Sequence, residues 1–162
     1  MALTTDIVAS YRRPGRVLAR RLSVPQGRGE ARALVTVMLA CLLIFVAQWP
    51  RLSREAYLTG RDFGMLAGGA LLGWIFIAPL VLYLIAALSH LVARAFGGRA
   101  TWLEARMALF WALLAAAPLW LFWGLIAGFI GPGPALDAVG VVALLAFLAI
   151  WIGGLRSVEM VP

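Results

Sequence analysis

Four long stretches of this chain contain no arginine, aspartate or glutamate, and the whole chain lacks lysine. These stretches cover residues 33–50, 63–93, 107–136 and 138–155. A helix needs roughly 20 apolar residues to cross the hydrocarbon core of a bilayer. A charged side chain at mid-membrane costs about 2.5 to 3.5 kcal/mol even on the most lenient scale, so its absence here is a strong constraint. The sequence therefore predicts four membrane-spanning segments.

The composition agrees with a chain that has lipid as its main solvent. Hydrophobic residues make up 64% of the 162 residues and charged residues only 13%. Transmembrane strands alternate polar and apolar residues, whereas residues 143–152 are apolar throughout. We therefore predict an all-α integral membrane protein, a four-span helical bundle preceded by an amphipathic, arginine-rich segment. Its predicted parts are a basic leader (1–32), a transmembrane domain (33–156) and a short tail (157–162).

Turn signals between the stretches set the limits of the predicted spans. The Gly-Gly pair at 97–98 ends the second span, and Thr101 and Glu104 stand at the spacing of a capping box that opens the third. The Gly-Pro-Gly-Pro sequence at 131–134 cannot continue a helix, and Asp137 follows it, where a helix N-terminus favours negative charge. The second and third spans are expected to form a tight antiparallel hairpin. The predicted spans are residues 33–50, 63–93, 103–130 and 136–155.

The uneven distribution of arginine predicts the orientation of the chain in the membrane. With a cytoplasmic N-terminus, eleven of the fourteen arginines lie on the cytoplasmic side: seven in the leader, three at 94–106, and Arg156. Only Arg51, Arg54 and Arg61 then face the outside, as the positive-inside rule requires. An even number of spans returns the C-terminus to the cytoplasm as well.

The leader contains two short amphipathic segments, 6–13 and 14–23, in which apolar residues alternate with arginines. Such segments lie in the membrane interface, where each arginine near anionic head groups contributes about 1 kcal/mol. A solvated tail that only sets topology is the alternative. A nucleic-acid partner is not expected, because no folded module holds the basic charge. The arginines expected to contact lipid head groups are Arg12, Arg13, Arg16, Arg20 and Arg21.

Small residues recur at spacings that let transmembrane helices approach closely. Lipid provides no hydrophobic drive between helices, so close backbone contact at glycine supplies much of their packing energy. The spacing fits contact with another helix of the same chain and contact with a second protein, and the two uses are compatible. The candidate helix-packing or partner-binding residues are Gly64, Gly68, Gly69, Gly73, Gly124, Gly128, Gly140 and Gly153.

Pro79 and Pro118 each lie near the middle of a long predicted span. Proline lacks an amide hydrogen and its ring clashes with the preceding turn, so each should kink its helix and free a carbonyl. Helix breaks mark mid-membrane binding sites in transporters. Because the neighbours of both prolines are apolar, we expect no ligand site at either.

Tyr83, His90 and Glu104 are the polar residues that the sequence places together, at the cytoplasmic end of the predicted hairpin. Histidine can sense pH or move protons near neutrality. The simpler interpretation is an interfacial histidine that is hydrogen-bonded to lipid head groups or to backbone. An enzyme would need His90 within hydrogen-bond reach of Glu104, and we do not expect an enzyme.

No cofactor and no metal ion is expected. A single cysteine, Cys41, and a single histidine cannot supply the four ligands of a structural zinc site. No second histidine exists to complete a pair of haem ligands. The tryptophans deep in the third span, Trp111, Trp120 and Trp123, are expected to fill packing space.

Several features follow one another in a set order along the chain: Arg13-Pro14, Pro79, Tyr83, His90, Phe96-Gly97-Gly98 and a helix from Thr101 through Pro118. This order resembles the bacterial branch of the Yip1-domain family, small multi-span membrane proteins named for a eukaryotic Golgi relative that interacts with Rab GTPases. Members typically have five spans, so the resemblance implies that the fifth is missing here. It also implies an integral membrane protein without known catalytic residues. The lysine-free, alanine-rich composition suggests a bacterial source, so we expect the bacterial inner membrane and no role with Rab.

We therefore expect a non-enzymatic membrane protein that binds or organises other membrane proteins or lipids. The expected partners are anionic lipid head groups and other integral membrane proteins, and a homo-oligomer is compatible with the same faces. One alternative is an accessory subunit of a larger bioenergetic or translocation complex. Another is a small oligomeric transporter or channel, in which His90→Ala or Tyr83→Phe would abolish flux.

Overall fold

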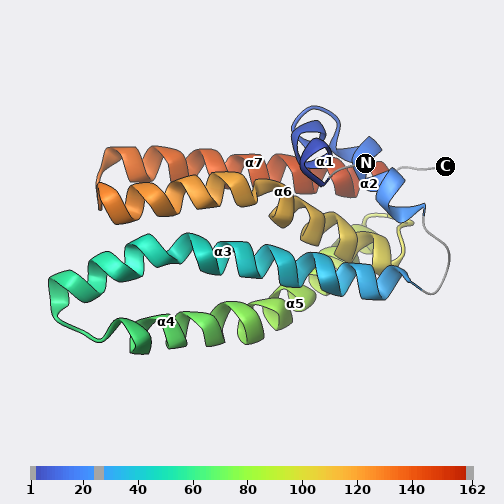
Figure 1. The fold of residues 1–162 in the computed structure, drawn as a ribbon. Helices are drawn as coiled ribbons and strands as arrows, with labels where there is room; N and C mark the ends of the chain where they lie inside the picture. The colour runs from blue at the N-terminus through green and yellow to red at the C-terminus, as the bar shows by residue number, and fades with distance from the viewer. Residues whose placement is uncertain (1–2, 24–27, 160–162) are drawn as a thin grey trace.

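A computed structural model describes residues 3–23 and 28–159 of the chain (Figure 1). Over these residues the protein is an all-α membrane bundle, and four of its helices are long and apolar enough to cross a membrane, which confirms the predicted fold class. The four are α3 (Gly29–Thr59), the continuous helix Phe63–Ala95, α6 (Trp102–Phe129) and α7 (Pro134–Glu159). Two short helices precede them, α1 (Leu3–Ser10) and α2 (Pro14–Leu22).

Three of the four long helices extend beyond the predicted spans, because a helix ends where its backbone hydrogen bonding ends and not at the edge of the bilayer. Helix α3 continues through Pro50 and ends at Gly60, whose φ of 67° is left-handed. Helix α7 begins at Pro134, since proline suits the first turn of a helix. The predicted limits 33–50 and 136–155 are therefore too short for the helices that contain these spans.

The second spanning helix contains a wide turn just before Pro79. The amide of Ala78 donates to the carbonyl of Gly73, five residues earlier, as in a π-helix. This wide turn accommodates the proline, which cannot donate to the preceding turn. The irregularity expected at Pro79 is thus a π-helical segment within a continuous helix. The three parts of this helix are α4 (Phe63–Leu71), the π segment η1 (Leu72–Ile77) and α5 (Ala78–Ala95).

Helix α6 starts at the capping box that the sequence predicts. The Thr101 hydroxyl accepts from the Glu104 amide at 3.3 Å, and the Glu104 carboxylate accepts from the Thr101 amide at 2.6 Å. Gly97, with a φ of 87°, turns the chain between α5 and α6. Figure 1 shows α6 changing direction near its middle, where Pro118 lies.

Helix α6 is the centre of the bundle. Every residue at 107–117 is buried, and α3 and α7 make the most extensive contacts with α6. In the most apolar stretch of each helix, 56% of the residues are buried in α6, but only 11% in Phe63–Ala95. The second spanning helix is therefore peripheral and leaves most of its surface for other molecules.

The arginine-rich segments gather at one end of the bundle. At this end the Glu159 carboxylate near the end of α7 accepts from the Ala100 amide at 3.1 Å, in the turn before α6. Helix α2 packs against the same part of α7. At the opposite end, the Arg54 guanidinium donates to the Gly128 carbonyl at 3.4 Å. The fold thus places the two groups of arginines at opposite ends of the bundle.

Candidate functional site

Two of the eight candidate glycines bring α6 against α3. A Cβ on Gly124 would lie 2.8 Å from the carbonyl carbon of Ala47 and still closer to its oxygen. A Cβ on Gly128 would lie 2.6 Å from the carbonyl carbon of Pro50. The opposing atoms are backbone, together with the Cβ of Pro50, whose ring is fixed to the backbone, so they cannot move aside as a flexible side chain can. These glycines therefore serve packing within the chain.

Two further glycines lie on α7 and also pack within the bundle. A Cβ on Gly140 would lie 3.0 Å from the indole nitrogen of Trp123 on α6. A Cβ on Gly153 would lie 2.8 Å from the ring of Pro14, in the leader. The glycines of α7 thus allow both α6 and the leader to approach α7 closely.

The remaining four glycines have no other helix against them in the described part of the chain. A Cβ on Gly68, Gly69 or Gly73 would meet no heavy atom within 4 Å. A Cβ on Gly64 would meet only the carboxylate of Asp62, which caps the same helix. These four glycines therefore lie on the outward surface of α4 and η1, with the pairs Gly64/Gly68 and Gly69/Gly73 on two sides of the helix, and we call this surface the glycine face.

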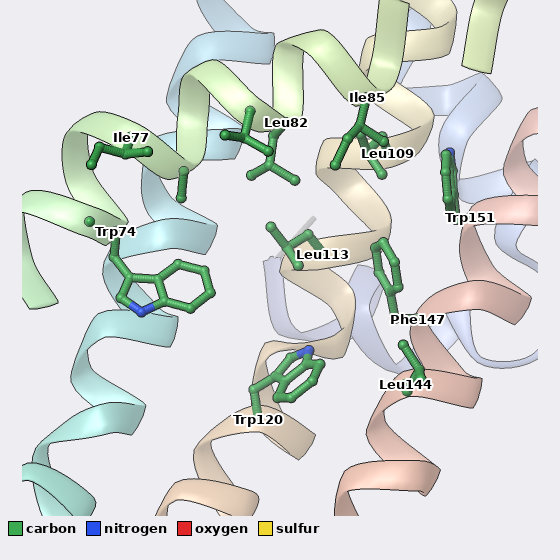
Figure 2. Close-up of a pocket in the computed structure, with 13 residues that line it drawn as sticks. Trp74, Ile77, Leu82, Ile85, Leu109, Leu113, Trp120, Leu144, Phe147 and Trp151 are labelled. Carbon is green, nitrogen blue, oxygen red and sulfur yellow. The ribbon is translucent and has the colours of Figure 1, made fainter. Parts of the chain in front are cut away.

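An apolar groove begins at this glycine face and runs between α5 and α7, with α6 as its floor (Figure 2). Its volume is about 540 Å³, which is in the range of small-molecule and peptide sites. No charged residue lines it, so its chemistry suits an apolar occupant. The lining residues are Gly73, Trp74, Ile77, Ala78, Val81, Leu82, Ile85, Leu109, Leu113, Trp120, Leu144, Phe147 and Trp151.

Two of the residues that line the groove, Trp120 and Trp151, carry buried indole N–H groups without an acceptor among the described residues. An unsatisfied buried donor costs about 1 to 3 kcal/mol. The sequence predicts that Trp120 fills packing space, and in the structure one side of it instead borders the groove.

The leader is docked on α6 through a polar contact that no sequence pattern predicts. The indole nitrogen of Trp111 donates to the Ser10 hydroxyl at 2.9 Å, and the Arg21 guanidinium lies 3.7 Å from the centre of the same indole. The Asp6 carboxylate accepts hydrogen bonds from both Arg20 and Arg21. Asp6 is the only acidic residue before Glu30, and this is the one sequence signal for the contact.

Tyr11 of the leader reaches the bend in α6. Its hydroxyl donates to the Ala115 carbonyl at 3.0 Å. Pro118 deprives the Leu114 carbonyl of its usual donor and disturbs the turn that contains Ala115. Partial burial raises the pKa of the Tyr11 phenol, so the hydroxyl stays protonated and can donate. The leader thus supplies a donor beside the carbonyl that the proline frees.

The leader arginines fall into two groups. Arg20 and Arg21 bind Asp6, whereas Arg12, Arg13 and Arg16 are exposed. Helix α2 buries its apolar residues Val17 and Leu18 in the core of the protein. An apolar face that rests entirely on lipid is therefore wrong for these two residues. Head-group contact by the arginines stays a prediction.

Tyr83, His90 and Glu104 lie on the α5–α6 hairpin but form no hydrogen bonds with each other there. Glu104 serves the capping box, and the Tyr83 ring packs edge-on against Phe110 at 4.9 Å. His90 is only 1% exposed and lies 4.3 Å from Trp102, between ring centres. Neither of its ring nitrogens has a hydrogen-bond partner among the described residues, so the backbone hydrogen bond expected for His90 is absent there, and a bond to a lipid head group stays a prediction.

The fold and these surfaces define a helical membrane protein in which two spans, Phe63–Ala95 and α7, are mostly unburied, with 11% and 17% of their most apolar stretches buried. Cys41, in the middle of α3, is buried and has a free thiol. Within residues 3–23 and 28–159, no three histidine, cysteine or acidic side chains come together as possible metal ligands.

Comparison with protein-family models, curated proteins and solved structures found no match.

Proposed function

We propose that this protein is a non-enzymatic membrane protein that binds a transmembrane helix of another membrane protein. The main support is the contrast between two sets of glycines at similar spacing. Gly124 and Gly128 meet the α3 backbone, whereas a Cβ on Gly69 or Gly73 would meet no heavy atom within 4 Å. Helices in lipid associate through small residues, so the glycine face has the chemistry of a helix contact without a helix on it.

The groove beside the glycine face supports the same function. It combines apolar residues from three helices in a volume of about 540 Å³, in which the side chains of a partner helix can pack. An accessory subunit of a larger membrane complex is the specialised form of this function and would have a fixed stoichiometry in the purified complex.

We also propose that the protein lies in the bacterial inner membrane with both termini in the cytoplasm. The separation of the arginine-rich segments from Arg51, Arg54 and Arg61 supports this orientation. A relationship to the Yip1-domain family is part of the same proposal. The π segment before Pro79, the turn at 97–98 and the cap at Thr101 follow one another in the order on which that resemblance rests.

Photo-cross-linking in the membranes of the source organism tests the helix-binding function. A photoreactive phenylalanine replaces Val81, which lines the groove and is 47% exposed. The control position is Leu145 on α7, which is also exposed but does not line the groove. We expect a protein adduct of one defined mass from position 81, several-fold more abundant than from position 145. Mass spectrometry of the adduct identifies the partner, and a second copy of this chain would count as one.

A second substitution tests whether formation of the adduct depends on the glycine face. Gly69→Leu fills the open space on that face and should reduce the adduct from position 81 several-fold, because a partner backbone can no longer approach. Labelling of lipid alone at both positions, in the presence and absence of Gly69→Leu, would contradict the proposed function.

A further inference from the structure

A cavity of about 470 Å³ lies between the leader and the first turns of α3, on a different side of α6 from the groove. Three arginines line it: Arg21 from α2, Arg28 just before α3, and Arg32 in the first turns of α3. The rest of its lining is Leu3, Ala31, Val35, Thr36, Leu39 and Leu114. We name this space the leader cavity.

The leader cavity has more positive charge than the protein neutralises. The Asp6 carboxylate is bonded to Arg21 at 2.7 Å and also to Arg20. Glu30, the other nearby carboxylate, is paired with Arg106 at 2.6 Å. In the described ranges no ion pair involves Arg28 or Arg32. An anion in the cavity would satisfy groups that the protein leaves unpaired.

The polar and apolar parts of the cavity follow one face of α3. Arg28 and Arg32 stand four residues apart, and Val35 and Leu39 continue the same face. From Arg28 to Leu39 the helix rises roughly 16 Å, so the charged end and the apolar end are well separated. A free phosphate ion would use only the charged end. A phospholipid has a phosphodiester at one end and acyl carbon atoms beyond it, and it would use both.

We infer that the leader cavity is a binding site for one anionic phospholipid. The phosphodiester lies between the guanidinium groups of Arg28 and Arg32, near Arg21, and the upper part of an acyl chain lies along Val35, Leu39 and Leu114. This site is distinct from the exposed arginines of the leader and goes beyond the helix-binding function. Because the cavity is closed on one side by the leader, the bound lipid also joins the leader to α3.

Native mass spectrometry of the full chain in a mild detergent tests the site. Phosphatidylglycerol and phosphatidylcholine of the same acyl chains are titrated separately. We expect one saturable phosphatidylglycerol and weaker binding of phosphatidylcholine. Arg28→Gln with Arg32→Gln should weaken phosphatidylglycerol binding about twenty-five-fold, since each arginine near an anionic head group contributes roughly fivefold. The matched control, Arg12→Gln with Arg16→Gln, removes the same charge from exposed positions and should retain the saturable site.

Two further measurements distinguish a lipid site from a site for a free phosphate ion. Val35→Trp fills the apolar end without changing charge at a position that is 65% exposed, and it should also weaken binding. Glycerol phosphate, a soluble head-group fragment, should not compete at concentrations that match the lipid. Equal binding of the two lipids, equal loss in both arginine pairs, unchanged binding in Val35→Trp, or equal affinity for glycerol phosphate would each overturn the inference.

Discussion

Gly124→Ala should lower the free energy of unfolding of the bundle, whereas Gly68→Ala should leave it unchanged or raise it slightly. The added Cβ at position 124 would lie 2.8 Å from the carbonyl carbon of Ala47, so α3 and α6 must separate. Overpacking of this kind costs typically about 1 to 3 kcal/mol, and the opposing group here is backbone. At position 68 the Cβ meets open space, and alanine favours helix over glycine by about 0.5 to 1 kcal/mol.

Unfolding by sodium dodecyl sulfate in mixed micelles, followed by tryptophan fluorescence, measures both variants. Both substitutions replace glycine by alanine within a helix. The changes in helix propensity and in hydrophobicity are therefore the same, and the difference in stability reports the difference in packing. Equal stability of the two variants would show that α3 and α6 do not meet at Gly124.

Trp111→Ala should cause the largest loss of stability and should also release the leader. The indole is only 1% exposed, and truncating a buried aromatic residue to alanine costs about 3 to 5 kcal/mol. Its N–H group bonds Ser10 and its ring lies under the Arg21 guanidinium, so the same change removes two contacts of the leader. Trypsin should then cleave after Arg16 and Arg20 faster than in the unaltered protein.

Trp111→Phe is the matched control for that prediction. Phenylalanine keeps most of the buried ring but cannot donate to Ser10, so the loss should be about 1 to 2 kcal/mol with an intermediate rate of cleavage. If both variants lose the same stability and the leader stays protected from trypsin in each, the docking of the leader on α6 is contradicted.

Local features of the sequence were enough to predict the order of the helices and several of their ends. The capping box of Thr101 and Glu104 depends on a spacing of three residues, and the structure contains both of its hydrogen bonds. The left-handed turn at Gly97 is equally local. Such signals act over a few residues and do not depend on the rest of the fold.

Contacts between distant residues could not be predicted in the same way. Gly64 and Gly68 have the same spacing as Gly124 and Gly128, but only the second pair meets another helix. Spacing fixes which residues share a helix face, and it does not fix what that face touches. His90 is a similar case, because its burial depends on Trp102 in the next helix.

The packing of the leader against α6 could not be predicted from sequence patterns for the same reason. Ser10 and Trp111 are 101 residues apart, and neither belongs to a motif that pairs them. The charge pattern of the leader is typical of a segment at a lipid surface, and it is equally compatible with docking once Asp6 binds Arg20 and Arg21. What distinguishes a leader docked on the protein from one on a lipid surface is the burial of Val17 and Leu18 in the protein core.

Labelling of single cysteines in intact cells tests the four-span bundle with both termini on one side most directly. In a Cys41→Ala background, cysteine is placed at exposed positions Thr4, Arg99 and Arg156 and, at the opposite end, Thr59. A maleimide that cannot cross the membrane should label position 59 in intact cells, and the other three only after the membrane is opened. Labelling of positions 4 and 156 from opposite sides would mean an odd number of crossings and would contradict the proposed arrangement.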